Sequence, residues 1–271
     1  MIIGNKAFDT KRHTYIMGIL NVTPDSFSDG GRYQQLDAAL LHAEEMIRDG
    51  ADILDIGGES TRPGHTQITC QEEIERTAPV IERLKKEFGI PISIDTYKSS
   101  VAEAALKAGA DLVNDIWGLK YDARMAPLIA EYGAACCLMH NREEAVYNDF
   151  LTDFIEDMRE CVRIAGNASI ADDKIILDPG VGFGKTYEMN LAIIREVGRM
   201  HELHYPILLG TSRKSVIGLT LDLPAGQREE GTLATTVYGM MNGCSFVRVH
   251  DVKANRRAIQ MTEAIIHSNH Q

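Results

Sequence analysis

The stretch D-G-A-D-I-L-D-I-G at residues 49–57 contains the junction from which the fold is built. Gly50 can end the helix-periodic segment before it, because glycine adopts the left-handed conformation that closes a helix at little cost. The run at 53–57 is almost continuously apolar, as expected for a strand that is buried on both faces. The junction recurs loosely as A-G-A-D-L at 108–112, so the chain repeats a unit in which a helix stop feeds a buried strand.

Eight apolar runs of this kind predict strands at residues 16–22, 53–57, 92–95, 112–116, 135–140, 175–178, 207–210 and 246–250. Helix-periodic segments lie between them at residues 37–49, 71–88, 99–108, 124–132, 151–165, 189–201 and 231–242. Eight strand–helix units in 271 residues predict one α/β domain over residues 1–271, a (β/α)8 TIM barrel. We expect a short N-terminal hairpin to close its bottom. A doubly wound open sheet is the alternative.

Composition limits the classes of partner. The net charge of -11 argues against a general nucleic-acid binder, but local cations could still hold an anionic small molecule. The five cysteines have no C-x-x-C spacing and are typical of reduced thiols in the cytoplasm. From the charged residues at the start we expect no signal peptide, and no apolar run approaches the roughly 18 residues that span a bilayer. We therefore expect a cytoplasmic protein with small-molecule substrates, without nucleic-acid or membrane partners.

Polar residues follow or end the predicted strands: Asn21, Asp95, Asn114, Asp178, Lys214, Arg248 and His250. One such residue can simply begin a loop, since loops are polar. As a set they mean more, because the carboxyl ends of barrel strands form a single rim where active sites lie. Apolar neighbours should turn several of them inward, where a buried carboxylate needs a partner. The pattern predicts a pocket for a flat, polar, hydrogen-bonding ligand.

The glycine-rich stretch G-V-G-F-G at 180–184 resembles a phosphate-binding loop only superficially. A Walker A loop needs glycine where Pro179 stands, and a dinucleotide fingerprint needs glycine where Lys185 stands. We therefore expect no nucleotide here, and we expect the glycines to allow close backbone approach over a ligand.

The segment G-T-S-R-K-S at 210–215 is a better candidate for an anion site. A helix that begins at Ser212 or Arg213 would point free N–H groups at the barrel mouth, and a plain helix cap by Ser212 is compatible with this. His140 and His250 have no second histidine at ligand spacing, which argues against a tight structural metal. Mg²⁺ held mainly by a substrate diphosphate needs little protein and stays open.

Eight motifs then occur in one order along residues 15–257: N-V-T-P-D-S-F-S-D-G-G (21–31), D-I-G-G-E-S-T-R-P-G (55–64), I-D-T (94–96), N-D-I (114–116), L-M-H (138–140), D-P-G-V-G-F-G-K (178–185), G-T-S-R-K-S (210–215) and R-V-H-D (248–251). With them the chain resembles the dihydropteroate synthases. The resemblance implies a homodimeric barrel enzyme of folate biosynthesis. Such an enzyme joins 6-hydroxymethyl-7,8-dihydropterin diphosphate to p-aminobenzoate and releases dihydropteroate and diphosphate.

The resemblance also implies residue roles. The implied pterin site is Asp95, Asn114, Ile116, Met139, Asp178, Phe183, Lys214 and Arg248. The implied diphosphate site is Asn21, Arg62, Arg248 and His250, with Mg²⁺ as cofactor near Asn21. The implied p-aminobenzoate site is Phe27, Thr61, Pro63, Phe183, Lys214 and Ser215. Catalytic roles fall on Asp95, Asp29, Lys214 and Arg248, and the loops at 23–33 and 60–69 resemble lids that complete the site around substrate.

Two alternatives share the barrel. A methyltetrahydrofolate-dependent corrinoid methyltransferase has a similar D-P-x pterin edge, but it needs neither the S-T-R-P-G loop nor the R-K-S segment, and both are present. A non-catalytic pterin-binding paralogue would be expected to lack Asp95, Lys214 or the first-loop motif, and all of them remain.

Overall fold

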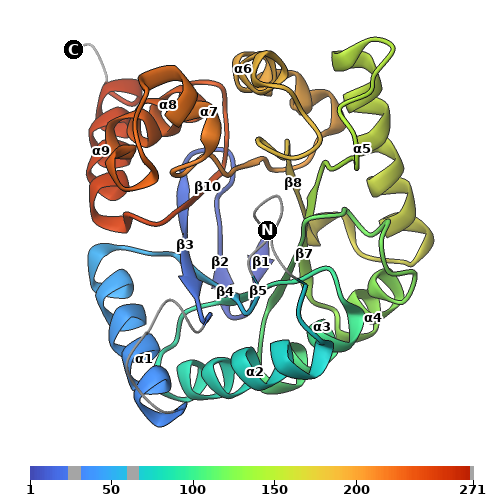
Figure 1. The fold of residues 1–271 in the computed structure, drawn as a ribbon, viewed down its shortest axis with the longest axis vertical. Coiled ribbons are helices and arrows are strands. Elements are labelled where there is room, and N and C mark those ends of the chain that lie inside the picture. The colour runs from blue at the N-terminus through green and yellow to red at the C-terminus, as the bar shows by residue number, and fades with distance from the viewer. Residues whose placement is uncertain (24–31, 60–66, 269–271) are drawn as a thin grey trace.

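In a computed structural model the chain forms a ring of strands surrounded by helices, with the N-terminus near the centre of the ring in projection (Figure 1). The structure describes residues 1–23, 32–59 and 67–268, without the side chains of residues 32–35. The predictions for Phe27, Asp29, Thr61, Arg62 and Pro63, and most of both proposed lids, therefore lie outside the described residues.

Eight parallel strands form the inner ring in the order β8-β7-β6-β5-β4-β3-β10-β9. A parallel bridge between Leu177 and Ile207 joins β8 to β9 and closes the ring. The strands are β3 Tyr15–Asn21, β4 Ile53–Gly57, β5 Ile92–Asp95, β6 Leu112–Asp115, β7 Ala135–Met139, β8 Ile175–Asp178, β9 Leu208–Leu209 and β10 Phe246–Val249. The predicted (β/α)8 barrel is confirmed, and the open-sheet alternative is wrong.

The outer layer of the described chain consists of α1 Arg32–Asp49, α2 Cys70–Glu87, α3 Ser99–Ala108, α4 Met125–Tyr132, α5 Phe150–Asn167, α6 Tyr187–Arg195, α7 Ser215–Leu221, α8 Glu229–Met241 and α9 Val252–Ile266. Local sequence sets several of the ends. Thr69 and Glu72 form a reciprocal capping box at the start of α2. Gly109 and Gly133 end α3 and α4 in the left-handed conformation.

The helix predicted at 189–201 is split. The α-helix ends at Arg195, and a 3₁₀-helix runs over Val197–Leu203. Glycine is about 1 kcal/mol less favourable than alanine inside an α-helix, and Gly198 is the second residue of the 3₁₀-helix.

The start predicted for the helix after the seventh strand is also wrong. Helix α7 begins at Ser215, with Lys214 as its N-cap and no side-chain capping bond. Arg213 has a left-handed φ of 58°, which keeps it out of an α-helix. Ser212 does not cap the helix, because its Oγ lies 2.9 Å from His250 Nδ1.

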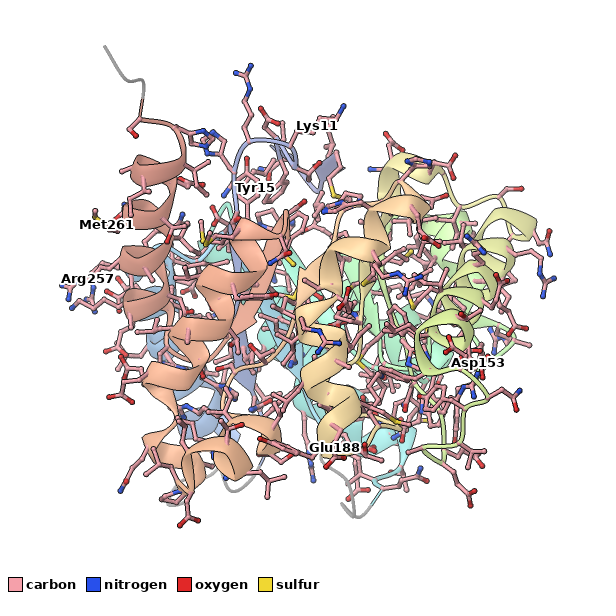
Figure 2. All side chains as sticks on the ribbon, turned by 90° about the horizontal axis from the view of Figure 1, so that it is seen from above. Lys11, Tyr15, Asp153, Glu188, Arg257 and Met261 are labelled. Carbon is pink, nitrogen blue, oxygen red and sulfur yellow. The ribbon has the colours of Figure 1, made fainter. Side chains whose placement is uncertain are left out.

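The bottom of the barrel is closed by the predicted hairpin, β1 Ile2–Ile3 and β2 Lys6–Ala7. Its Ile3 and the following Phe8 join one buried apolar cluster with inward residues of the strands, which are Met17, Ile53, Leu112, Ala135, Cys137, Ile176, Leu208 and Phe246. We call this cluster the floor. Lys11 and Tyr15 lie at this end of the molecule, and Glu188 at the start of α6 lies at the other (Figure 2).

A second and larger apolar core lies between the strands and the helices, as expected for parallel strands that are covered on both faces. Within the described ranges, no helix is both long enough and apolar enough to cross a membrane.

Candidate active site

Polar side chains line the barrel interior directly above the floor, towards the carboxyl ends of the strands. The strand register places Asn21 beside Gly57, Gly57 beside Asp95, and Asp95 beside Asn114, so these residues form one row. On the other side of the ring, Asp178 ends β8 next to Met139. Parallel strands in register thus gather side chains that are far apart in sequence.

Arg248 lies at the centre of this layer and bridges two buried carboxylates. Its Nε donates to Asp55 Oδ2 at 2.6 Å, and its Nη2 donates to Asp95 Oδ2 at 2.5 Å. Asn114 Nδ2 donates to the same Asp55 oxygen at 3.2 Å. Burial by itself would lower the pKa of Arg248, but Asp55 and Asp95 raise it above its ordinary value. The guanidinium therefore stays charged and fixed in place.

Three buried polar atoms in this layer have no hydrogen-bond partner among the described residues: Asp55 Oδ1, Ser93 Oγ and Asp95 Oδ1. Burial raises the pKa of Asp95 to about 7, against the lowering effect of Arg248. Buried polar atoms are rarely left unpaired in native proteins. The free oxygen of Asp95 is thus an acceptor suited to the donor groups of a bound ligand.

Asp178 and Lys214 form the opposite side of the pocket. Asp178 Oδ1 accepts the Gly180 N–H at 2.7 Å. A Cβ at Gly210 would lie 3.4 Å from Asp178 Oδ2 and 3.9 Å from Lys214 Nζ, so glycine leaves open a space flanked by both groups. Burial raises the pKa of Asp178 and lowers that of Lys214 to about 8, while each charge favours the other. A carboxylate and an ammonium beside one gap can bind paired donors and acceptors.

An apolar wall completes the pocket. Ile116 and Met139 form a small buried cluster with Tyr97, and Phe183 packs against it. Lys214 Nζ donates to Val181 O at 2.5 Å and lies 4.9 Å from the centroid of the Phe183 ring. Flat apolar walls with a few convergent polar groups are typical of small-molecule sites.

Ser215 was predicted for the p-aminobenzoate site and His250 for the diphosphate site. Ser215 is the exposed first residue of α7, and His250 Nδ1 pairs with Ser212. His250 also lines an open groove of about 370 Å³ whose walls carry Lys253 and Arg257 together with Glu45. This groove mixes both signs of charge, so its charge alone does not select an anion.

His140 is not part of the pocket. It is fully buried, and its ring lies between Lys185 Nζ, 2.8 Å from Nδ1, and Asp157 Oδ2, 2.9 Å from Nε2. Burial lowers its pKa to about 4, so the ring is neutral near pH 7. Strand alternation could have foretold this, because Met139 points inward and its neighbour must point outward.

Sequence reasoning missed two functional candidates, Asp55 and Lys185. Asp55 lies inside a run of buried residues, and a lone charge within a parallel strand needs a partner. That signal was available, but the partner Arg248 is 193 positions away. Lys185 belongs to the motif at 178–185, but the motif alone indicates no role for its side chain.

The glycines of residues 180–184 allow a close approach that the sequence did not predict. A Cβ at Gly180 would lie 1.9 Å from His140 O, and one at Gly184 would lie 2.5 Å from Arg142 O. Both glycines have left-handed φ angles, 66° and 55°. The close approach at these two positions is therefore to the backbone after β7.

No group of three or more His, Cys, Asp or Glu side chains suited to a metal ion occurs among the residues that the structure describes. Asn21 supplies one amide oxygen at the end of β3, facing Gly57. Mg²⁺ commonly keeps several waters and binds through substrate phosphates with few protein ligands. The donor set thus fits a metal that a diphosphate brings with it.

Residues 17–250 match the family model described as pterin binding enzyme. The chain belongs to the pterin-binding enzyme family. The dihydropteroate synthase of Clostridium beijerinckii is 57% identical over 98% of this chain and 99% of its own length. That of Bacillus subtilis is 56% identical over 96% of this chain and 91% of its own length.

Solved structures agree with this family membership. A dihydropteroate synthase from Clostridium difficile, crystallised in the presence of pteroic acid, superposes with a TM-score of 0.94 and 52% identity over 97% of this chain and 100% of that one. The Yersinia pestis enzyme in a sulfonamide drug complex gives 0.92 and 39%, over 99% of each chain.

Proposed function

We propose that the pocket between Asp95 and Asp178 is where this chain carries out the dihydropteroate synthase reaction. The activity itself follows from relatedness. Relatives of that name are 56–57% identical over nearly the whole chain, so the chain is a transferase of folate biosynthesis. Two observations carry the site: the buried Asp95 Oδ1 has no hydrogen-bond partner among the described residues, and Asp178 and Lys214 flank the space beside Gly210.

The pterin ring is proposed to lie across this pocket. The Asp178 carboxylate would accept the adjacent N–H groups of the aminopyrimidinone edge, with Asn114 and Lys214 at neighbouring polar atoms. Arg248 would stack on the ring, because a guanidinium plane suits a flat heterocycle and an adjacent phosphate. Ile116, Met139 and Phe183 would form the apolar walls; the cluster of Ile116 and Met139, with Phe183 packed on it, supports this.

The diphosphate is proposed to bind Asn21, Arg62, Arg248 and His250. Mg²⁺ would be held by Asn21 and the diphosphate, and when bound it would neutralise charge on the leaving group. The p-aminobenzoate site is proposed to include Phe27, Thr61, Pro63, Phe183, Lys214 and Ser215. For the residues outside the described ranges, the motif resemblance is the support.

The proposed order of bond changes is carbon–oxygen cleavage ahead of amine attack. The aryl amine is a weak nucleophile, whereas the diphosphate leaves among cations. The electron-rich dihydropterin can delocalise the positive charge, and Asp95, with Asp29 from the first loop, would stabilise it. The amine of p-aminobenzoate then forms the carbon–nitrogen bond and gives up its proton.

One assay tests the proposed site. Purified protein with dihydropterin diphosphate, p-aminobenzoate and Mg²⁺ should form dihydropteroate, and Asp95→Asn should lower kcat by about 10²–10³-fold. Substrate labelled at the bridging oxygen should scramble its label in the wild type without p-aminobenzoate, and the variant should suppress this. An Asp95→Asn enzyme with normal turnover would remove Asp95 from the reaction. Absence of scrambling, with a rate that rises steeply with amine basicity, would contradict the dissociative order.

Three wider properties are also proposed: a single domain, a cytoplasmic location and a homodimer. Four of the five cysteines are buried thiols, which suits a reducing compartment. The neighbouring helices α7, α8 and α9 carry exposed apolar side chains, among them Leu219 at 67%, Met241 at 72% and Met261 at 62% exposure. Exposed apolar surface of this kind supports pairing with a second copy of the chain. Sedimentation velocity can test this pairing through the mass of the protein in solution.

A further inference from the structure

The turn between β8 and α6 is held by side chains on nearly every peptide group. Lys214 binds Val181 O at 2.5 Å, Asn190 Oδ1 accepts the Gly182 N–H at 2.6 Å, and Tyr147 donates to Gly184 O at 2.7 Å. This turn carries Phe183, whose ring lies beside Lys214 and the apolar wall. So many separate anchors restrict the backbone of the turn, and with it the point from which the Phe183 ring extends.

Lys185 supplies the anchor that spans the turn. Its Nζ lies 2.9 Å from Gly180 O, 2.9 Å from Phe183 O and 2.8 Å from His140 Nδ1. These three acceptors match the three N–H donors of one ammonium group. Two of them are carbonyls at the two ends of the segment that contains the aromatic ring, so the ammonium joins both ends.

His140 can accept from Lys185 only in one tautomer. With Nδ1 as acceptor, the ring proton must be on Nε2, which lies 2.9 Å from Asp157 Oδ2. Arg142 Nε donates to the same Asp157 oxygen at 2.6 Å and holds the carboxylate in place. The hydrogen-bonded order is therefore Asp157, His140, Lys185 and then the turn.

The proposed reaction gives Lys185, His140 and Asp157 no contact with the reacting atoms. The wall of the pocket at Phe183 nevertheless depends on them. We propose that Lys185 is a positioning residue for the condensation: its ammonium, oriented by His140 and Asp157, fixes the turn that presents Phe183 to the substrates. This inference rests on the proposed role of Phe183 in the p-aminobenzoate site. It assigns a task to a lysine that the reaction itself does not use.

The primary test is Lys185→Met, which keeps an unbranched chain and removes all three donors. We expect kcat/KM for p-aminobenzoate to fall roughly 10- to 100-fold, since a displacement of about 1 Å of a positioning group has an effect of that size. The KM for dihydropterin diphosphate should change less, by up to about threefold, because Phe183 is only one wall of the proposed pterin site and Asp95, Asn114 and Asp178 lie outside the turn. Trp117, the single tryptophan, packs on the same apolar cluster as Phe183, so its emission should shift.

Lys85→Met is the matched control. Lys85 is also a partly buried lysine, and its Nζ bonds both oxygens of Asp111, which precedes β6 at the bottom of the barrel. We expect unchanged substrate constants and unchanged Trp117 emission. An equal fall in kcat/KM for both lysine variants would reveal general destabilisation and overturn the proposal.

Two further variants keep the test decisive. On the wild-type background, Asp157→Asn should lower kcat/KM for p-aminobenzoate about threefold. On the Lys185→Met background it should have no added effect, since the effects of residues that act as one unit are not additive. If Lys185→Met does not fold, Asp157→Asn decides, and normal kinetics and emission there would contradict the inference.

Phe183→Ala separates the inference about Lys185 from the proposed p-aminobenzoate site on which it rests. A fall there without one in Lys185→Met refutes the inference alone, and no fall in Phe183→Ala refutes the proposed site as well.

Discussion

Two layers of side chains fill the inside of the barrel, and they lie two positions apart on the same strands. The lower residue is apolar and the upper one polar in the pairs Ile53 and Asp55, Leu112 and Asn114, Ile176 and Asp178, and Phe246 and Arg248. The floor is fully apolar and tightly covered by the hairpin. The layer above it contains buried charges, and Asp55 and Asp95 each keep one oxygen without a described partner. One step along each strand thus separates residues that stabilise the fold from residues arranged for a ligand.

The largest effect should come from the floor. Phe246 is fully buried, with ring centroids 5.6 Å from Phe8 and 5.7 Å from Tyr15. Phe246→Ala should lower the free energy of unfolding by about 3–5 kcal/mol through lost contacts and a cavity. Urea denaturation measures this. At temperatures well below the Tm, kcat/KM should stay within about twofold of wild type. A loss of activity in fully folded protein would show that the two layers are not separable.

Asp178→Asn makes the opposite change in the upper layer. It keeps the shape but replaces a charged acceptor partly by a donor, so affinity for pteroic acid should fall by about 2–4 kcal/mol in calorimetry. The free energy of unfolding should change by less than about 1 kcal/mol, because the variant also loses the cost of burying a charge. Asp172→Asn is the control, because Asp172 lies just before the start of β8, at the opposite end of the strand from Asp178. It should leave the affinity for pteroic acid unchanged. Normal pteroic acid binding by Asp178→Asn would exclude Asp178 from the site.

The upper layer should also set the pH dependence of kcat/KM. Burial raises the pKa of Asp95 to about 7, so its carboxylate forms, and activity rises, as pH increases through 7. Burial lowers the pKa of Lys214 to about 8, so its positive charge, and activity, are lost above that pH. Each limb should approach tenfold per pH unit. Lys214→Arg should move the alkaline limb upward, and a limb that does not move must belong to another group.

The smallest effect is expected from a change that reduces the volume of the proposed pocket without destabilising the fold. A Cβ at Gly210 meets Asp178 Oδ2 at 3.4 Å and Lys214 Nζ at 3.9 Å without a clash, so Gly210→Ala should fold normally. Affinity for pteroic acid should fall by about 1 kcal/mol, because the methyl group fills part of the pocket. Gly166→Ala in α5, where a Cβ meets nothing within 4 Å, should leave affinity unchanged. Unchanged binding in Gly210→Ala would place the pterin elsewhere.

The sequence could predict the barrel because its information is local. Apolar runs and helix periodicity recur along the chain, glycines such as Gly109 end some of the helices, and the strand ends then place Asp95, Asn114 and Asp178 on one rim. The sequence does not predict the start of α7, because that start depends on a left-handed backbone conformation at Arg213. Residues other than glycine rarely adopt this conformation.

Pairings between distant strands were the part that could not be predicted. The sharing of Arg248 between Asp55 and Asp95 joins positions 193 and 153 residues apart, and no local pattern records such a contact. The same holds for Lys185, whose partner His140 is 45 residues away. Motif resemblance predicts residues for the proposed ligand site, but it gives no indication of the residues that hold them in place.

The ring of strands has a seam. Five residue pairs join β3 to β4, whereas an isolated bridge at Leu177 and Ile207 joins β8 to β9 in the described chain. Amide hydrogens along this seam should exchange with solvent through smaller openings than those between β3 and β4. Asp178 ends β8 on one side of the seam, and Lys214 follows β9 on the other. A ligand bound by both side chains would therefore link the two strands where they share the fewest pairs. Bound substrate would then stabilise the closure of the barrel, and slower amide exchange at Leu177 would measure that effect.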